Sequence, residues 1–165
     1  RIRMQQHYLD EDVFIRSMAT KGVCGGLCEA VYGAIDLLDA FGKDVILIET
    51  TGVGQTETDI TKVADTVIVV LTAGFGDSIQ LMKAGLIEIA DIIVVNKTDL
   101  AGAETFVSDI RDGPSYSLGK AEQSIVLTQA HNNIGIDELY REVEKRSQLA
   151  KARVGTTQRQ QGDEK

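Results

Sequence analysis

Several features that mark particular protein classes are scarce in this sequence of 165 residues, which holds two Cys, one Pro and no Trp. Two Cys cannot form a disulfide framework, and residues 1–6 lack the apolar core of a signal peptide, so we expect a cytoplasmic protein. With one Pro and a hydrophobic share of 43%, the composition excludes collagen-like and disordered chains and predicts a globular domain. Apolar runs such as residues 67–71 are far shorter than the about 20 residues needed to cross a bilayer, so no membrane-spanning helix is expected.

Positive charge is also scarce, because 17 Lys and Arg stand against 25 Asp and Glu and give a formal net charge of −8. A surface of this sign repels nucleic acids and anionic lipids, so we expect neither a nucleic-acid partner nor a membrane partner. Any phosphate that the protein holds must therefore be bound by a local group of donors.

Four short runs rich in β-branched residues predict buried strands. They cover residues 44–50, 66–72, 91–96 and 124–128. The runs are nearly continuous in Val, Ile and Leu, which is typical of parallel strands covered on both faces. Helical spacing of apolar residues occurs in residues 27–38, 77–90 and 135–143. This alternation predicts an α/β fold, a parallel sheet with helices on both faces.

The domain is expected to cover residues 1–144, and residues 145–165 are expected to form a polar C-terminal extension without core-forming periodicity beyond Leu149. In parallel sheets of this class, ligands bind outside the carboxyl ends of the strands. The loops that follow the four predicted strands are therefore where we expect the chemistry.

One such loop begins with Asn96, Lys97, Thr98 and Asp99, an NKxD sequence. An aspartate carboxylate can accept hydrogen bonds from both N1 and the N2 amino group of guanine, a donor pair that adenine lacks. Asn96 would join neighbouring loops, and the stem of Lys97 would cover the plane of the base. The alternative is a solvated polar turn, but the position at the end of a strand favours a guanine site.

A second such loop begins at Glu49, at the tip of the first predicted strand. A carboxylate there suits Mg²⁺, which phosphate sites hold through one or two carboxylates, often by way of water. Gly52 and Gly54 follow, and they lack the Cβ atoms that would keep the backbone away from a phosphate. The alternative is an ordinary turn after a strand.

Five blocks of sequence, in unbroken order, resemble the MeaB/ArgK family of P-loop GTPases. They are residues 14–22, 25–27, 49–55, 76–85 and 90–99. The resemblance extends over roughly residues 1–140. It implies a GTP-hydrolysing chaperone that binds GTP or GDP with Mg²⁺ and forms a homodimer at full length. The implied partner is an adenosylcobalamin-dependent mutase of the methylmalonyl-CoA mutase type, whose cofactor delivery or exchange the GTPase gates.

The resemblance also implies roles for particular residues. Guanine would be bound by Asn96, Lys97 and Asp99, and by a loose match to a fifth base-contacting loop in Thr128, Gln129 and Ala130. Catalytic roles would fall to Glu49, at the Mg²⁺ site, and to Lys83, which could swing toward phosphate. The switch residues would be Arg16, Gly52, Gly54, Gln55, Asp77 and Gln80. The alternatives are an exposed helical lysine for Lys83 and a surface salt bridge for Arg16.

The sequence departs from the family in lacking the phosphate-binding motif G-x-x-x-x-G-K-[ST]. Its two Gly-Lys pairs begin at Gly42 and Gly119 and do not fit the motif. We therefore expect a sheet that lacks the first strand and the P-loop, truncated before Arg1, with an exposed strand edge beside the strand that ends at Glu49. The chain alone is expected to bind GTP weakly or not at all and not to hydrolyse it.

Two other functions stay open at this point. A metallochaperone GTPase would use a metal site, for which His7, Cys24 and Cys28 are weak candidates because zinc sites usually show CxxC pairs or four ligands. A catalytically inactive fragment would bind the mutase without nucleotide. A preference for ATP would contradict the interpretation of Asp99.

Overall fold

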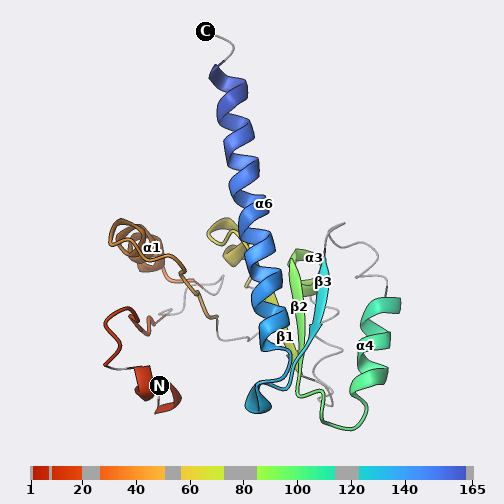
Figure 1. Cartoon of the computed structure of the whole chain (residues 1–165). Coiled ribbons are helices and arrows are strands. Elements are labelled where there is room, and N and C mark those ends of the chain that lie inside the picture. Colours follow the sequence, from red (N-terminus) through yellow and green to blue (C-terminus); the bar gives the residue numbers. More distant parts are fainter. Residues whose placement is uncertain are drawn as a thin grey trace.

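The computed structural model describes residues 2–7, 9–19, 27–50, 57–72, 85–113 and 123–162. Within these residues the centre of the molecule is a parallel sheet in the order β1-β2-β3, drawn in Figure 1. The strands are β1 (Ile68–Thr72), β2 (Ile92–Asn96) and β3 (Ser124–Leu127). These strands confirm three of the four predicted runs.

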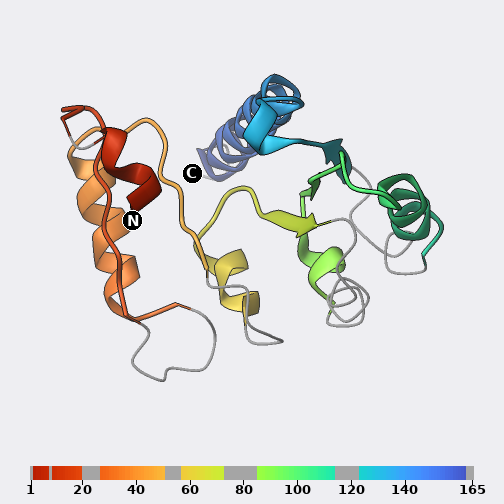
Figure 2. The same cartoon turned by 90° about the horizontal axis from the view of Figure 1, so that it is seen from below.

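Helices cover both faces of this sheet, as Figure 2 shows. On one face, α3 (Leu86–Ile89) and α4 (Ala103–Asp112) pack with Ile93 and Val95 of β2. On the other face, α6 (Ile136–Gly162) packs through Leu139 and Val143 on a cluster that includes Ile92 and Val94. Alternate residues of β2 thus enter two different cores, which is why the strand is apolar without interruption. The predicted α/β fold is confirmed.

The helix α1 (Ala30–Ala40) confirms the helical prediction for residues 27–38 with a shift of a few residues. It ends where Gly42 adopts a φ of 75°, a left-handed conformation that glycine reaches without strain. The amide of Gly42 then donates to the carbonyl oxygen of Asp39 at 2.8 Å. Of the predicted helix over residues 77–90, the structure describes only the end, as α3.

The predicted strand over residues 44–50 is wrong. This segment runs without strand pairing to β1, β2 or β3, and its side chains Val45 and Leu47 are 69% and 86% exposed. A run of β-branched residues favours extended backbone, but a strand also needs a neighbour that completes its hydrogen bonds. No part of the described chain supplies one on either side of this segment.

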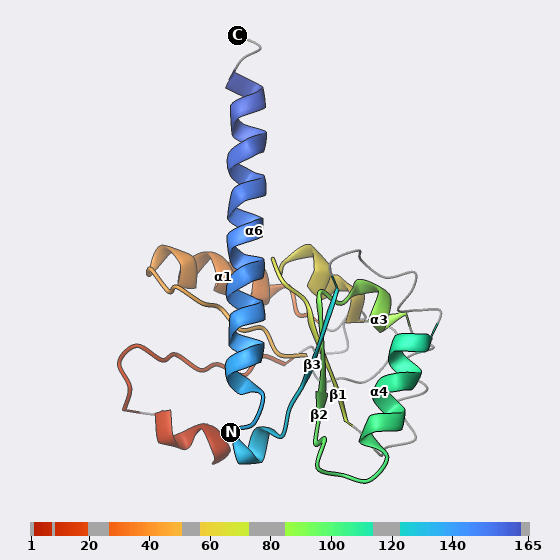
Figure 3. The same cartoon turned by 45° about the vertical axis from the view of Figure 1, so that its right-hand side comes forward.

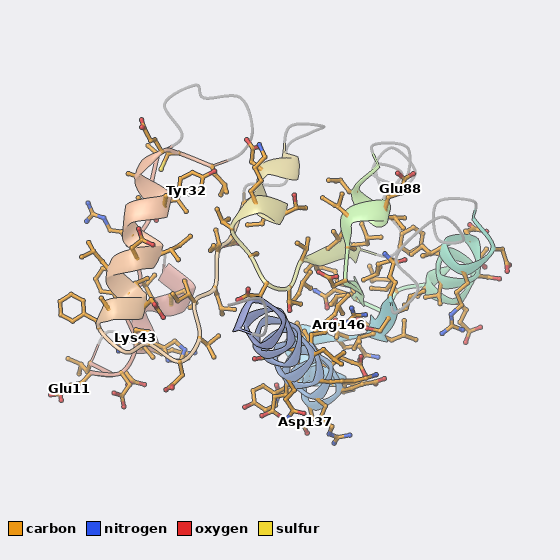
Figure 4. The ribbon with its side chains drawn as sticks, turned by 90° about the horizontal axis from the view of Figure 1, so that it is seen from above. Glu11, Tyr32, Lys43, Glu88, Asp137 and Arg146 are labelled. Carbon is orange, nitrogen blue, oxygen red and sulfur yellow. The ribbon has the colours of Figure 1, made fainter. Side chains whose placement is uncertain are left out.

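The long helix α6 is anchored at its middle and then extends away from the sheet, as Figures 1 and 3 show. Arg146, labelled in Figure 4, donates to the carbonyl oxygen of Asp91 at 3.3 Å, and its Nη1 lies 3.7 Å from Asp91 Oδ1. The other carboxylate oxygen of Asp91 accepts from the amide of Val67 at 2.8 Å. The pair therefore ties α6 to the starts of β1 and β2. The boundary expected at residue 144 lies inside α6, which crosses it without a break.

None of the helices described is both long and apolar enough to cross a membrane. Three short 3₁₀ helices complete the described elements: η1 (Ile2–His7), η2 (Glu57–Lys62) and η3 (Ala130–Asn132).

Candidate functional site

The loops that follow β2 and β3 lie together at the carboxyl edge of the sheet, at its lower end in Figures 1 and 3. The parallel register sets Val95 of β2 opposite Leu127 of β3. Asn96 and Thr128, the next residues of each chain segment, are therefore neighbours. The parallel pairing thus brings the loops after these two strands to the same edge of the sheet.

The side chain of Asn96 joins the two loops. Its Oδ1 accepts a hydrogen bond from Thr128 Oγ1 at 3.1 Å and another from the amide of Ala130 at 3.1 Å. Two donors on one oxygen fix the orientation of the amide group. The geometry agrees with the expectation that Asn96 connects neighbouring loops, and its part in binding a nucleotide stays a prediction.

Burial alternates along the four residues of this loop. Asn96 and Thr98 are half-buried and bond to the loop after β3, whereas Lys97 and Asp99 are exposed. Lys97 has a φ of 58°, and its carbonyl oxygen accepts from the amide of Leu100 at 3.0 Å, so the chain turns sharply here. The loop thus exposes the side chains of Lys97 and Asp99, while Asn96 and Thr98 fix its backbone to the loop after β3.

The loop after β3 is held by its own hydrogen bonds. The backbones of Gln129 and Ile134 exchange two of them, at 3.0 and 3.3 Å, and Asn132 Nδ2 donates to Gln129 Oε1 at 3.0 Å. The amides of residues 128–130 donate to Val95, Ile134 and Asn96, so the start of this loop is fixed against β2 and against its own far end. A contact of residues 128–130 with a base stays a prediction.

Two other predicted residues lie elsewhere. Arg16 is exposed in the segment of residues 9–19, which lies on the side of α1, where Lys43 Nζ donates to the carbonyl oxygen of Asp12 at 2.8 Å. Glu49 is exposed near the end of the unpaired segment 44–50. Among the described residues, no hydrogen bond or ion pair joins either side chain to the loops after β2 and β3.

Several predicted residues lie outside the described part of the chain. They are Cys24, Gly52, Gly54, Gln55, Asp77, Gln80 and Lys83. Where the structure does describe side chains, no group of three or more His, Cys, Asp or Glu is placed to hold a metal ion. The carboxylate of Glu49 fits the preference of Mg²⁺ for oxygen ligands, and its exposure leaves it accessible to a hydrated ion.

This arrangement can be compared with known proteins. The family model described as methylmalonyl Co-A mutase-associated GTPase MeaB matches residues 1–165. The chain belongs to the MeaB family. The family match agrees with the sequence resemblance and with the parallel sheet that carries the NKxD loop.

Individual relatives agree with the family match. The chain is 50% identical over 145 residues to a protein of Pyrococcus abyssi whose name places it among the GTPases, a match that covers 85% of this chain and 45% of the relative. It is 41% identical over 97 residues to the GTPase ArgK of Escherichia coli, covering 59% of this chain and 29% of the relative. It is 36% identical over 97 residues to the mitochondrial methylmalonic aciduria type A homolog of Caenorhabditis elegans, covering 59% and 24%. The chain spans about half, or less, of the length of the curated relatives it matches.

Two features of this edge were not predicted from the sequence. Thr98 donates a hydrogen bond to the loop after β3, and Gly135 has a φ of 77° at a place where a Cβ would overlap the carbonyl oxygen of Leu127. Neither contact has a signature in the sequence, because each depends on the pairing of two strands. The helix α4 was also missed, although Ala103, Val107 and Ile110 follow helical spacing and are buried.

Proposed function

We propose that the protein is a cytoplasmic GTPase that binds GTP or GDP and serves as a chaperone of an adenosylcobalamin-dependent mutase of the methylmalonyl-CoA mutase type. The proposed binding of GTP or GDP rests on one observation: Asn96 accepts two hydrogen bonds that hold the loops after β2 and β3 together. The family and the names of the relatives support the GTPase activity and the mutase partner.

Guanine recognition follows from the exposed side of the NKxD loop. The Asp99 carboxylate would accept hydrogen bonds from N1 and N2 of guanine, and the stem of Lys97 would lie over the ring. The backbone of residues 128–130 would close the opposite side of the base. Adenine offers no matching pair of donors and would leave the Asp99 carboxylate unpaired beside the base.

Hydrolysis would use residues at the other end of the nucleotide. Glu49 would hold Mg²⁺, directly or through water, and the ion would neutralise charge that develops on the phosphates. Lys83 would serve as a second catalytic group that moves toward the phosphates. The proposed switch residues are Arg16, Gly52, Gly54, Gln55, Asp77 and Gln80. At its full length the protein would act as a homodimer, with residues 1–144 as the nucleotide-binding part and residues 145–165 as an extension.

The guanine site is tested by measuring GDP and ADP affinities of the protein at the length at which its native cell makes it. The unaltered protein should prefer GDP, and Asp99→Asn should weaken GDP binding by about 100-fold, because hydrogen bonds to a charged acceptor contribute about 1.5–3 kcal/mol each. Asp109→Asn is a matched control, since Asp109 is exposed on α4. Equal affinities for GDP and ADP would refute the proposed site.

The chaperone role needs a separate experiment. Purified mutase with bound adenosylcobalamin is mixed with the protein, GTP and Mg²⁺, and the half-life of mutase activity during turnover is measured. A longer half-life that requires GTP, together with a complex in size-exclusion chromatography, is the expected result. An unchanged half-life without complex formation would remove the mutase from the proposal and leave the nucleotide site unaffected.

A further inference from the structure

Thr98 stands at the variable position of the NKxD loop, and the proposed guanine site gives it no contact with the base. Its side chain is nevertheless half-buried and turned toward the loop after β3. The amide of Thr98 and its Oγ1 each lie 3.2 Å from the carbonyl oxygen of Thr128. Because that acceptor is a carbonyl, the threonine hydroxyl must act as the donor.

The residue that Thr98 contacts is itself held from several sides. Thr128 is 2% exposed, its amide donates to the carbonyl oxygen of Val95 at 2.8 Å, and its hydroxyl donates to Asn96. The two bonds from Thr98 complete this set by engaging the Thr128 carbonyl oxygen. Asn96 and Thr98 therefore hold one buried residue from two points of the same loop.

Because buried and exposed residues alternate in this loop, the contacts of Thr98 affect where the base-binding side chain of Asp99 lies. Residues 96 and 98 are anchored to the loop after β3, and residues 97 and 99 are exposed between and beyond them. Asp99 follows Thr98 directly in the chain, so its carboxylate is positioned by the nearest anchor. A shift of Thr98 away from Thr128 would move Asp99 and residues 128–130 relative to each other.

We propose that Thr98 is a positioning residue of the guanine site, whose hydroxyl sets the separation between the Asp99 carboxylate and the backbone of residues 128–130. This inference rests on the proposed guanine binding. It assigns a function to a side chain that does not touch the nucleotide. The hydroxyl, rather than the methyl group, carries this role, because Oγ1 makes the contact with Thr128.

The variant Thr98→Val tests the proposal, because valine keeps the shape of threonine and removes the hydroxyl donor. Two controls accompany it. Thr98→Ser keeps the hydroxyl and removes the methyl group, and Thr105→Val makes the same change at an exposed position of α4. For each form at native length, the dissociation constants of GDP and IDP are measured, together with denaturant unfolding of the nucleotide-free protein.

Thr98→Val should bind GDP about fivefold more weakly, the effect of one neutral hydrogen bond, while Thr98→Ser and Thr105→Val should stay within about twofold of the unaltered protein. IDP lacks the N2 amino group, so it cannot make one of the two bonds to Asp99. If Thr98 positions Asp99, the preference for GDP over IDP should fall in Thr98→Val. A purely structural role would lower both affinities together and leave their ratio unchanged.

An unchanged ratio would overturn the proposal, and so would three further outcomes, each distinguishable from the others. Equal GDP affinity of Thr98→Val and the unaltered protein would exclude a role of the hydroxyl. A loss in Thr98→Ser as large as in Thr98→Val would assign the effect to packing of the methyl group. If the unaltered protein bound no GDP, the proposed guanine site itself would fail, and the role of Thr98 in it would fail as a consequence.

Discussion

Replacement of Gly135 by alanine should destabilise the protein strongly, and the structure indicates how much. Gly135 precedes α6 and has a φ of 77°, a conformation that costs an alanine about 1–2 kcal/mol. A Cβ on Gly135 would overlap the carbonyl oxygen of Leu127 and would lie 3.1 Å from its carbonyl carbon and 3.2 Å from the Cα of Thr128. All three atoms are backbone, so no side chain can rotate away.

The backbone at this point also has little freedom to shift. Leu127 ends β3, which is paired in register with β2, and the amide of Thr128 donates to Val95 at 2.8 Å. Overpacking of such fixed groups costs about 1–3 kcal/mol. Alanine also restricts the unfolded chain, which offsets about 0.5 kcal/mol of the loss. We expect Gly135→Ala to lower the free energy of unfolding by about 3 kcal/mol.

Gly102→Ala separates the two causes. Gly102 has a φ of 86°, and a Cβ built there meets nothing within 4 Å. This variant should therefore carry the conformational cost without the overlap, a loss of about 1 kcal/mol. Urea unfolding of both variants, followed by circular dichroism, gives the two values. If Gly135→Ala cost no more than Gly102→Ala, the argument from the Leu127 carbonyl would be refuted.

Two further predictions concern charged and titrating groups. Arg146→Met should lower the free energy of unfolding by about 2 kcal/mol in the same assay. The variant removes the positive charge beside the Asp91 carboxylate, and the side chains of Arg146 and Asp91 are only 12% and 13% exposed. Lys62→Met, which removes an ion pair whose lysine is 68% exposed, should leave stability unchanged, and equal effects of the two variants would contradict this reasoning. The hydrogen bond and the negative charge of Glu144 raise the pKa of Tyr140 above its ordinary 10.0, so the contact stabilises the fold below pH 10 and is lost as the pH rises through the raised pKa. Glu144→Gln should shift one tyrosine of the absorbance titration to lower pH, and an unchanged titration would exclude the contact.

The elements that could be predicted from the sequence are those whose own apolar residues show that they are buried. β2 is the clearest case, since its residues Ile92, Ile93, Val94 and Val95 are all at most 3% exposed and form an unbroken apolar run. The polar residues of the NKxD loop follow this run directly, so their position at the carboxyl edge could be inferred with the strand. The composition of a segment is therefore enough to predict a strand that is covered on both faces.

The features that could not be predicted depend on contacts between distant segments. The run 44–50 contains an apolar stretch like that of β2, yet it lacks a paired neighbour in the described chain and forms no strand. Thr98 and Gly135 act through the backbone at the end of β3, which is remote in sequence from Thr98. The register of β2 and β3 places these groups together, and that register is set by the pairing of the whole strands rather than by Thr98 or Gly135.

The two ends of the proposed nucleotide site therefore differ in what holds them in place. The base end rests on paired strands, because β2 and β3 set Asn96 and Thr98 against Thr128. In the proposal, the phosphate end would depend on Glu49, which lies at the end of a segment without strand pairing in the described chain. Discrimination between guanine and adenine should consequently persist when phosphate contacts are weakened, whereas hydrolysis should not. Measuring GMP against AMP binding, alongside GTP turnover, separates the two ends of the site in a single protein preparation.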